Sequence, residues 1–183
     1  MIVVVVLAAG EGRRFGGPVH KLRSVLDGVP VVRRAVDAAV GSGIGAVVVV
    51  TGAVDLDDLL PPDVAVVHNA GWASGQASSL RAGVAEADRR GAEAVVVGLG
   101  DMPFVPAAAW RAVAAAGGDL VTARFSGYRS PPVRIARSLW ADLPSEGDEG
   151  ARELMRRRPG LVTSVDVEGR ATDVDSTIDL DPG

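Results

Sequence analysis

The sequence of 183 residues contains no cysteine and only two histidines, His20 and His68. The absence of cysteine excludes disulfides, thiolate metal sites and a cysteine nucleophile, and two histidines do not supply a histidine-rich metal centre. Basic residues are not in excess, because 19 Lys and Arg stand against 23 Asp and Glu, for a net charge of −4. A general nucleic-acid-binding protein needs a basic face. We therefore expect no nucleic-acid partner.

Long hydrophobic runs are also missing. The apolar start covers only residues 1–9, which is too short to span a bilayer, and no basic segment precedes it as in a signal peptide. We therefore predict a cytoplasmic protein with no membrane partner. The hydrophobic content of 48% is ample for a folded core. The length fits one domain over residues 1–183.

The chain does contain a regular alternation of apolar runs and amphipathic segments. Strands are predicted at residues 2–6, 46–51, 64–67, 92–98 and 120–123, and helices from Pro30 to Gly41, over 75–90 and from Pro106 to Gly117. This order predicts an α/β fold with a single-domain, doubly wound, mainly parallel sheet. After residue 125 the rhythm changes, and we expect an insertion that forms one wall of a cleft, with a helix near residues 135–143 and a late strand at 161–167.

Ligands of such sheets lie beyond the carboxyl ends of the strands. The loops over residues 8–21, 68–75 and 99–104 follow the first, third and fourth predicted strands, so they should face one cleft. The first of these loops holds several glycines together with Arg14 and Lys21. Glycines allow successive backbone amides to surround an anion, and the cations add positive charge. The loop therefore predicts a phosphate site, although it matches neither the dinucleotide fingerprint nor a Walker A loop.

Aspartates are the candidate metal ligands. Asp101 directly follows the fourth predicted strand, and a carboxylate there can bind Mg²⁺ together with phosphate oxygens. An aspartate before Met-Pro can equally close an Asx turn. Near the end of the chain, Asp173 and Asp175 alternate with Val174, and an extended backbone would place both carboxylates on one face.

The segment of residues 69–80 is rich in small polar residues. Asn69, Gly75 and Ser79 could hydrogen-bond a base or ribose, and serines at this point could equally cap the following helix. Trp72 in the same segment is either a core residue or a stacking surface for a base.

Together these elements resemble the MobA-like nucleotidyltransferases, and most closely the MocA-type molybdenum cofactor cytidylyltransferases. The motifs that carry the resemblance are Leu7-Ala-Ala-Gly10-Glu-Gly-Arg-Arg14-Phe-Gly16 with Lys21, Asn69-x-x-Trp72-x-x-Gly75-x-x-Ser78-Ser79-Leu80-x-x-Gly83, Asp101-Met-Pro, Gly147-Asp148-Glu-Gly150-Ala-Arg152 and Asp173-Val-Asp175-Ser-Thr-Ile-Asp179-Leu. The resemblance covers nearly the whole chain. It implies a Rossmann-like nucleotidyltransferase fold, with residues 1–123 as the nucleotide-binding part and 124–183 as the acceptor-side part and closing strand.

The resemblance also implies roles for individual residues. Catalytic roles fall to Arg14, Lys21 and Asp101; the ligand-binding set is Leu7, Ala8, Ala9, Gly10, Gly12, Asn69, Gly75, Ser79, Asp148 and Arg152; and the metal ligands are Asp101 and Asp175. Arg14 and Lys21 would contact the phosphates, and Mg²⁺ would be the cofactor. Asp148 and Arg152 would lie near the acceptor. The pair Ala8-Ala9 favours CTP over GTP, because guanylyl-transferring relatives tend to carry a second glycine there.

The expected reaction is the transfer of CMP from CTP, or of another nucleotide from its triphosphate, to molybdopterin. A molybdenum hydroxylase would be a further partner. Three departures from the family pattern concern the acceptor and the phosphate loop: one extra residue before Lys21, Ser130-Pro-Pro-Val133, and Ser176 in place of threonine. The alternatives are a sugar- or polyol-phosphate acceptor, a catalytically silent nucleotide-binding protein of cofactor maturation, and, least favoured, a NAD-dependent oxidoreductase.

Overall fold

The computed structural model describes residues 1–12, 16 and 19–175. Seven strands form one sheet in the order β5-β4-β1-β6-β8-β7-β9, and a separate two-stranded ribbon pairs β2 with β3. The strands are β1 (Ile2–Ala8), β2 (Val25–Leu26), β3 (Val29–Pro30), β4 (Val47–Thr51), β5 (Ala65–His68), β6 (Ala94–Leu99), β7 (Leu120–Phe125), β8 (Tyr128–Ala136) and β9 (Val162–Asp166). The α-helices are α1 (Val31–Gly41), α2 (Gln76–Arg89), α3 (Ala107–Ala115) and α4 (Ala151–Arg157).

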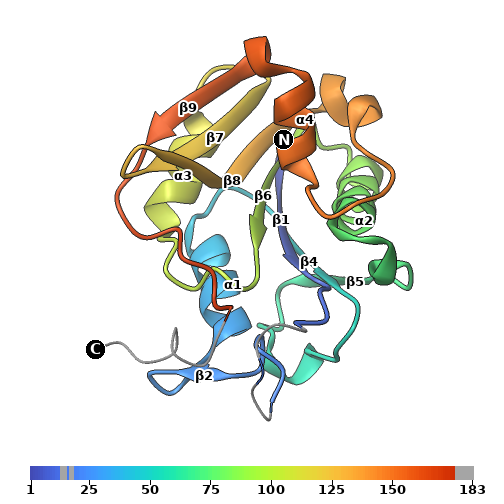
Figure 1. Ribbon diagram of the computed structural model, residues 1–183, viewed down its shortest axis with the longest axis vertical. Coiled ribbons are helices and arrows are strands. Elements are labelled where there is room, and N and C mark those ends of the chain that lie inside the picture. The colour runs from blue at the N-terminus through green and yellow to red at the C-terminus, as the bar shows by residue number, and fades with distance from the viewer. Residues whose placement is uncertain (13–15, 17–18, 176–183) are drawn as a thin grey trace.

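Helices cover both faces of the sheet, as Figure 1 shows for α1 and α3 on one side and α2 and α4 on the other. The central strand β1 explains this arrangement, since its successive side chains alternate between the faces. Val4 and Val6 pack into the cluster that holds α1 and α3, whereas Val3 and Val5 pack into the cluster that holds α2 and α4. A strand buried on both faces has a continuous apolar sequence, and β1 has such a sequence.

The predicted α/β fold with a mainly parallel sheet is confirmed. β1 pairs in parallel with β4 and β6, β4 with β5, and β7 with β9, while β8 runs antiparallel to both of its neighbours. The helix predicted over residues 75–90 is α2, and Pro106 stands immediately before α3. No helix among the described residues is both long and apolar enough to span a bilayer.

The strand β8 lies inside the sheet between β6 and β7 and was not predicted from the sequence. Pro131 and Pro132 argue against a central strand, because proline cannot donate to the ladder. The structure accommodates both prolines at a bulge: Thr122 of β7 pairs with Val133 and Ala123 pairs with Ser130, so the two prolines have no partner on β7. Pairing with β6 reaches only to Val133. The helix predicted near residues 135–143 is wrong in its start, since β8 runs to Ala136 and a 3₁₀ segment, Arg137–Asp142, follows.

The direction in which successive strands are added to the sheet reverses between β1 and β6. The chain moves outward from β1 through β4 to β5, and then returns to place β6 on the other side of β1. Such a switch point opens a crevice at the carboxyl ends of the two strands, because the connections leave in opposite directions. Leu7 of β1 pairs with Leu99 of β6, and the Gly100 amide donates to the Leu7 carbonyl over 2.8 Å. The loops after β1 and β6 therefore begin side by side.

Candidate active site

A cavity of about 450 Å³ lies at this switch point, beyond the ends of β1 and β6. The predicted residues that line it are Leu7, Ala8, Ala9, Gly10, Gly12, Lys21, Gly75, Ser79, Asp101, Asp148 and Asp175. They come from segments that are far apart in the chain, and the fold brings them around one space. Asn69 and Arg152 do not line the cavity, and Arg14 lies outside the described residues, as do Ser176 and Asp179.

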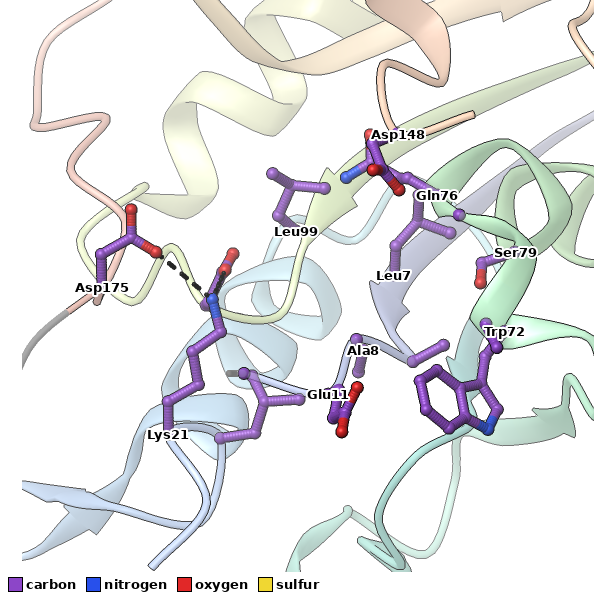
Figure 2. A pocket seen from close by; sticks show the side chains of 17 residues that line it. Leu7, Ala8, Glu11, Lys21, Trp72, Gln76, Ser79, Leu99, Asp148 and Asp175 are labelled. Atoms are coloured by element: carbon purple, nitrogen blue, oxygen red, sulfur yellow. Dashed lines mark hydrogen bonds and ion pairs between the residues drawn. The ribbon is translucent and has the colours of Figure 1, made fainter. Parts of the chain in front are cut away.

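One end of the cavity is ionic. The Lys21 ammonium lies 2.5 Å from Asp101 Oδ2 and 3.6 Å from Asp175 Oδ1. Figure 2 shows Lys21 reaching up from its loop toward Asp175, which comes from the opposite side on the C-terminal segment. The side chains of Lys21 and Asp101 are only 13% and 19% exposed, so solvent screens this pair weakly. The ammonium of Lys21 is thus held against two carboxylates.

A third carboxylate, that of Asp173, lies beside these two but does not itself line the cavity. Ligand oxygens of Asp101, Asp173 and Asp175 all lie within 4.8 Å of one another. Burial, and then the negative charges of Asp175 and Asp101, raise the pKa of Asp173 above its ordinary range. Crowded carboxylates repel each other unless a cation lies among them. Their oxygen donors suit Mg²⁺ or Mn²⁺, so the residues present fit the predicted divalent cation.

The last described segment of the chain delivers two of these carboxylates. Asp173 and Asp175 are not in a strand, yet both reach the cluster because Val174 between them points the other way. Val174 is fully buried against Leu26 and Val31, and its amide donates to the Asp101 carbonyl over 2.9 Å. A hydrophobic anchor and one backbone hydrogen bond therefore hold this segment at the end of β6.

The other end of the cavity is formed by the start of α2 and the loop before α4. Figure 2 shows Trp72 and Ser79 here, with Asp148 beside Gln76, on the side away from Lys21. The Ala77 amide donates to the Gly147 carbonyl over 2.9 Å, which ties the two segments together. Gly75 has φ of +109°, and a side chain there would collide with the backbone of Gly147. This glycine permits the close approach.

Asn69 lies outside the cavity lining and holds this end together through hydrogen bonds. Its side-chain amide donates to the hydroxyls of Ser78 (2.9 Å) and Ser79 (3.0 Å), and its Oδ1 accepts the Gly71 amide. The serine cap considered for α2 is wrong for Ser74, because Gly75 is the N-cap residue and the Ser74 hydroxyl donates to the Gly71 carbonyl. Asn69 thus shapes the segment that carries Trp72 and does not itself reach the cavity.

Several residues that line the cavity were not predicted from the sequence: Glu11, Leu22, Ala73, Gln76 and Leu99. Trp72, for which the sequence left open a core position or a stacking surface, also lines the cavity. The predicted metal ligands are Asp101 and Asp175, and Asp173 is an addition to that set. Gln76 and Leu99 stand next to predicted residues, at the first position of α2 and the last of β6, so their position at the carboxyl edge was a signal that could have found them.

A family model described as the MobA-like NTP transferase domain matches residues 4–162 of the chain. The chain belongs to this family. The family assignment made from the motifs is therefore confirmed, and it makes the protein a nucleotidyltransferase by family. The matched range begins in β1 and ends at the first residue of β9, so it contains the glycine loop after β1, Asp101 and the segment of Asp148.

Three known proteins illustrate the relationship. The nicotine blue oxidoreductase of Paenarthrobacter nicotinovorans is 32% identical over 94% of this chain and 91% of its own length. A nucleotidyl transferase from Methanothermobacter thermautotroptrophicus has a solved structure with a TM-score of 0.81 at 27% identity, covering 98% of this chain and 94% of that one. Rv0371C of Mycobacterium tuberculosis, solved in complex with manganese, gives a TM-score of 0.75 at 26% identity, covering 97% and 95%.

Proposed function

We propose that the protein is a cytoplasmic, divalent-cation-dependent cytidylyltransferase that transfers CMP from CTP to molybdopterin and releases pyrophosphate. The observation that carries this proposal is the meeting of Lys21 with Asp101, Asp173 and Asp175 at the end of a glycine loop. A cation for phosphates and an oxygen-rich set for a metal then lie at one end of one cavity.

Nucleotidyl transfer to a phosphate acceptor depends mainly on neutralising negative charge. An oxygen of the acceptor phosphate forms a bond to the α-phosphorus, the bond from that phosphorus to the bridging oxygen breaks, and pyrophosphate leaves with the electron pair. About five or six negative charges come together, so positioning and electrostatic stabilisation dominate. Lys21 would hold phosphate oxygens, and Arg14 would join it from the same loop. No histidine or cysteine nucleophile is needed.

Asp101, Asp175 and Asp173 would hold the divalent cation. When bound, this ion supplies charge neutralisation and fixes the phosphate oxygens for in-line displacement. The manganese complex of Rv0371C, a protein of similar fold, supports a divalent cation in this chain, and Mg²⁺ remains our expectation for the working ion. The Lys21 ammonium lies 2.5 Å from Asp101 Oδ2, so it offsets part of the negative charge of the carboxylates.

The base is proposed to be cytosine. Ala8 and Ala9 line the cavity where related guanylyltransferases tend to carry a second glycine, and Ala9 is only 4% exposed. We take the absence of that second glycine as favouring a pyrimidine over a purine. Leu7, Gly10, Gly12, Gly75 and Ser79 line the same space and would contact the nucleotide.

The acceptor is proposed from the family resemblance together with one contact. The loop of Asp148 is hydrogen-bonded to α2 and closes the cavity on the side of residues 124–175, which we take as the acceptor side. Arg152 is exposed just beyond this loop and would meet an anionic acceptor. Molybdopterin carries a terminal phosphate, and a molybdenum hydroxylase would receive the product. A sugar or polyol phosphate is the alternative acceptor.

Ligand binding and transfer test the proposal together. The unfolding temperature is to be measured with Mg²⁺ and, in turn, CTP, GTP, ATP and NAD, followed by transfer of label from [α-³²P]CTP to molybdopterin or to sugar phosphates. We expect the largest stabilisation from CTP and label transfer only to molybdopterin. Stabilisation by NAD alone would favour an oxidoreductase, as the name of the Paenarthrobacter relative suggests. Nucleotide binding without transfer to any acceptor would favour a silent maturation protein.

A further inference from the structure

His20 joins the two ends of the phosphate loop. Its ring Nε2 lies 3.0 Å from the Gly10 carbonyl oxygen, and the Leu22 amide donates to its Nδ1 over 3.2 Å. Nδ1 must carry a lone pair to accept that amide, so the proton of the neutral ring resides on Nε2, which donates to Gly10. The ring thus connects Gly10, two residues past the end of β1, to the turn that holds Lys21.

The ring also packs against the loop. Gly12 has φ of +67°, and a methyl group added there would come within 3.2 Å of both His20 Nε2 and Lys21 Cγ. The His20 carbonyl accepts the amides of Arg23 (2.9 Å) and Ser24 (3.1 Å), which makes Lys21 part of a helical turn. His20 therefore connects the described start of the loop, at Gly10 and Gly12, to the turn from which Lys21 extends.

We propose that neutral His20 is a positioning residue of the phosphate loop, and that its protonation loosens the loop and weakens nucleoside triphosphate binding. This rests on the proposed function. The imidazolium would carry hydrogens on both nitrogens, so the Nδ1 hydrogen would face the Leu22 amide hydrogen and the two donors would repel each other.

The surroundings of His20 keep its ring neutral near pH 7. Burial is the main cause that lowers the pKa of His20 below 6.5, and the positive charges of Lys21 and Arg23 lower it further, against the hydrogen bonds to the backbone of Gly10 and Glu11. Because the pKa is lower in the folded than in the unfolded state, the stability that this neutral ring contributes is present above pH 6.5 and is lost as pH falls through the folded pKa. The same fall in pH would weaken the loop.

The tautomer and the titration can be observed without any nucleotide. The chain has only two histidines, so His68→Gln leaves His20 as the single imidazole signal in a long-range ¹H–¹⁵N spectrum. We expect the Nε2–H tautomer at pH 7.5, a pKa below 6.5, and faster hydrogen exchange of the Leu22 amide once the ring is protonated. An Nδ1–H tautomer, or a pKa at or above 6.5, overturns the proposal.

Binding of CTP with Mg²⁺, measured by calorimetry from pH 5.5 to 7.5, tests the consequence. His20→Asn can still accept the Leu22 amide as an Asx turn but cannot reach Gly10, and His20→Phe keeps the ring without its nitrogens. At pH 7.5 we expect affinity losses of about threefold for His20→Asn and about tenfold for His20→Phe.

The carboxylates titrate in both the wild type and His20→Asn. The ratio of the two affinities therefore reports the pH effect of the His20 ring alone. This ratio should shrink as pH falls, whereas the His68→Gln control should follow the wild type. A ratio that does not change with pH, or a His20→Phe variant with wild-type affinity, overturns the role in binding. If the wild-type protein binds no nucleotide, the proposed function fails along with this role, and the spectra still decide whether His20 joins the loop ends.

Discussion

The two ends of the cavity are built in different ways. The ionic end takes Lys21, Asp101 and the segment of residues 173–175 from three distant parts of the chain, and it holds opposite charges against each other. The end around Trp72 is formed by one continuous segment that Asn69 organises through local hydrogen bonds, with a single loop docked onto it. The difference suggests a division of labour in which the ionic end governs the rate of transfer and the other end governs which nucleotide binds.

The largest effect is expected from Asp101→Asn, which keeps the shape of the side chain and removes its charge. The rate of pyrophosphate release should fall by about 10³-fold or more, because a cation ligand is lost at the reacting phosphates. The substitution removes the ion pair between Lys21 and Asp101. The unfolding temperature should nevertheless change little, because Lys21 keeps Asp175 nearby. Asp37→Asn, which removes only an exposed pair with Arg33, serves as the control. An Asp101→Asn enzyme with full activity would separate Asp101 from the metal.

Lys21→Met should change the rate of transfer and the affinity for Mn²⁺ in opposite directions. The rate should fall by about 10²- to 10³-fold, because one cationic contact to the phosphates is lost. Affinity for Mn²⁺ without nucleotide should rise, because the ammonium 2.5 Å from Asp101 no longer competes for the carboxylates. Titration followed by electron paramagnetic resonance measures this second property. Unchanged or weaker Mn²⁺ binding would mean that Lys21 does not occupy the position of the cation.

Trp72→Leu tests the opposite end. If the indole stacks on the base, KM for CTP should rise about tenfold with little change in kcat, and Trp72→Phe should recover most of the affinity. If Trp72 acts only in packing against the neighbouring cluster, the unfolding temperature should fall instead and KM should stay the same. Steady-state kinetics and thermal unfolding of both variants decide between the two roles.

The smallest effect is expected from Val174→Ala, which removes part of the hydrophobic anchor and no ligand atom. The carboxylates of Asp173 and Asp175 should then be less well placed, and Mn²⁺ affinity should fall roughly fivefold. CTP selectivity over GTP should not change, because the Trp72 end is untouched. Val165→Ala in β9 makes the same truncation away from the carboxylates and is the matched control. Equal Mn²⁺ affinities for the two variants would refute the anchoring role of Val174.

Most of the fold was predictable where local pattern and tertiary environment agree. The short, valine-rich apolar runs of β1, β4 and β6 favour strands buried on both faces, and the amphipathic pattern of α2 leaves one apolar side for the sheet. β8 was missed because Pro131 and Pro132 contradict a central strand unless a bulge removes them from the ladder, and a bulge depends on the partner strand.

For the candidate site, the sequence by itself determined the chemical groups: a glycine loop with Lys21 after β1, Asp101 after β6, and two aspartates flanking Val174. These follow from residue type and from the rule that loops after parallel strands share one edge. Only the tertiary structure decided that Asp173 joins the carboxylate cluster, that Asn69 stands behind the cavity, and that His20 spans the phosphate loop. Each of these depends on the direction in which a side chain leaves an irregular segment, and contacts between distant parts of the chain set that direction.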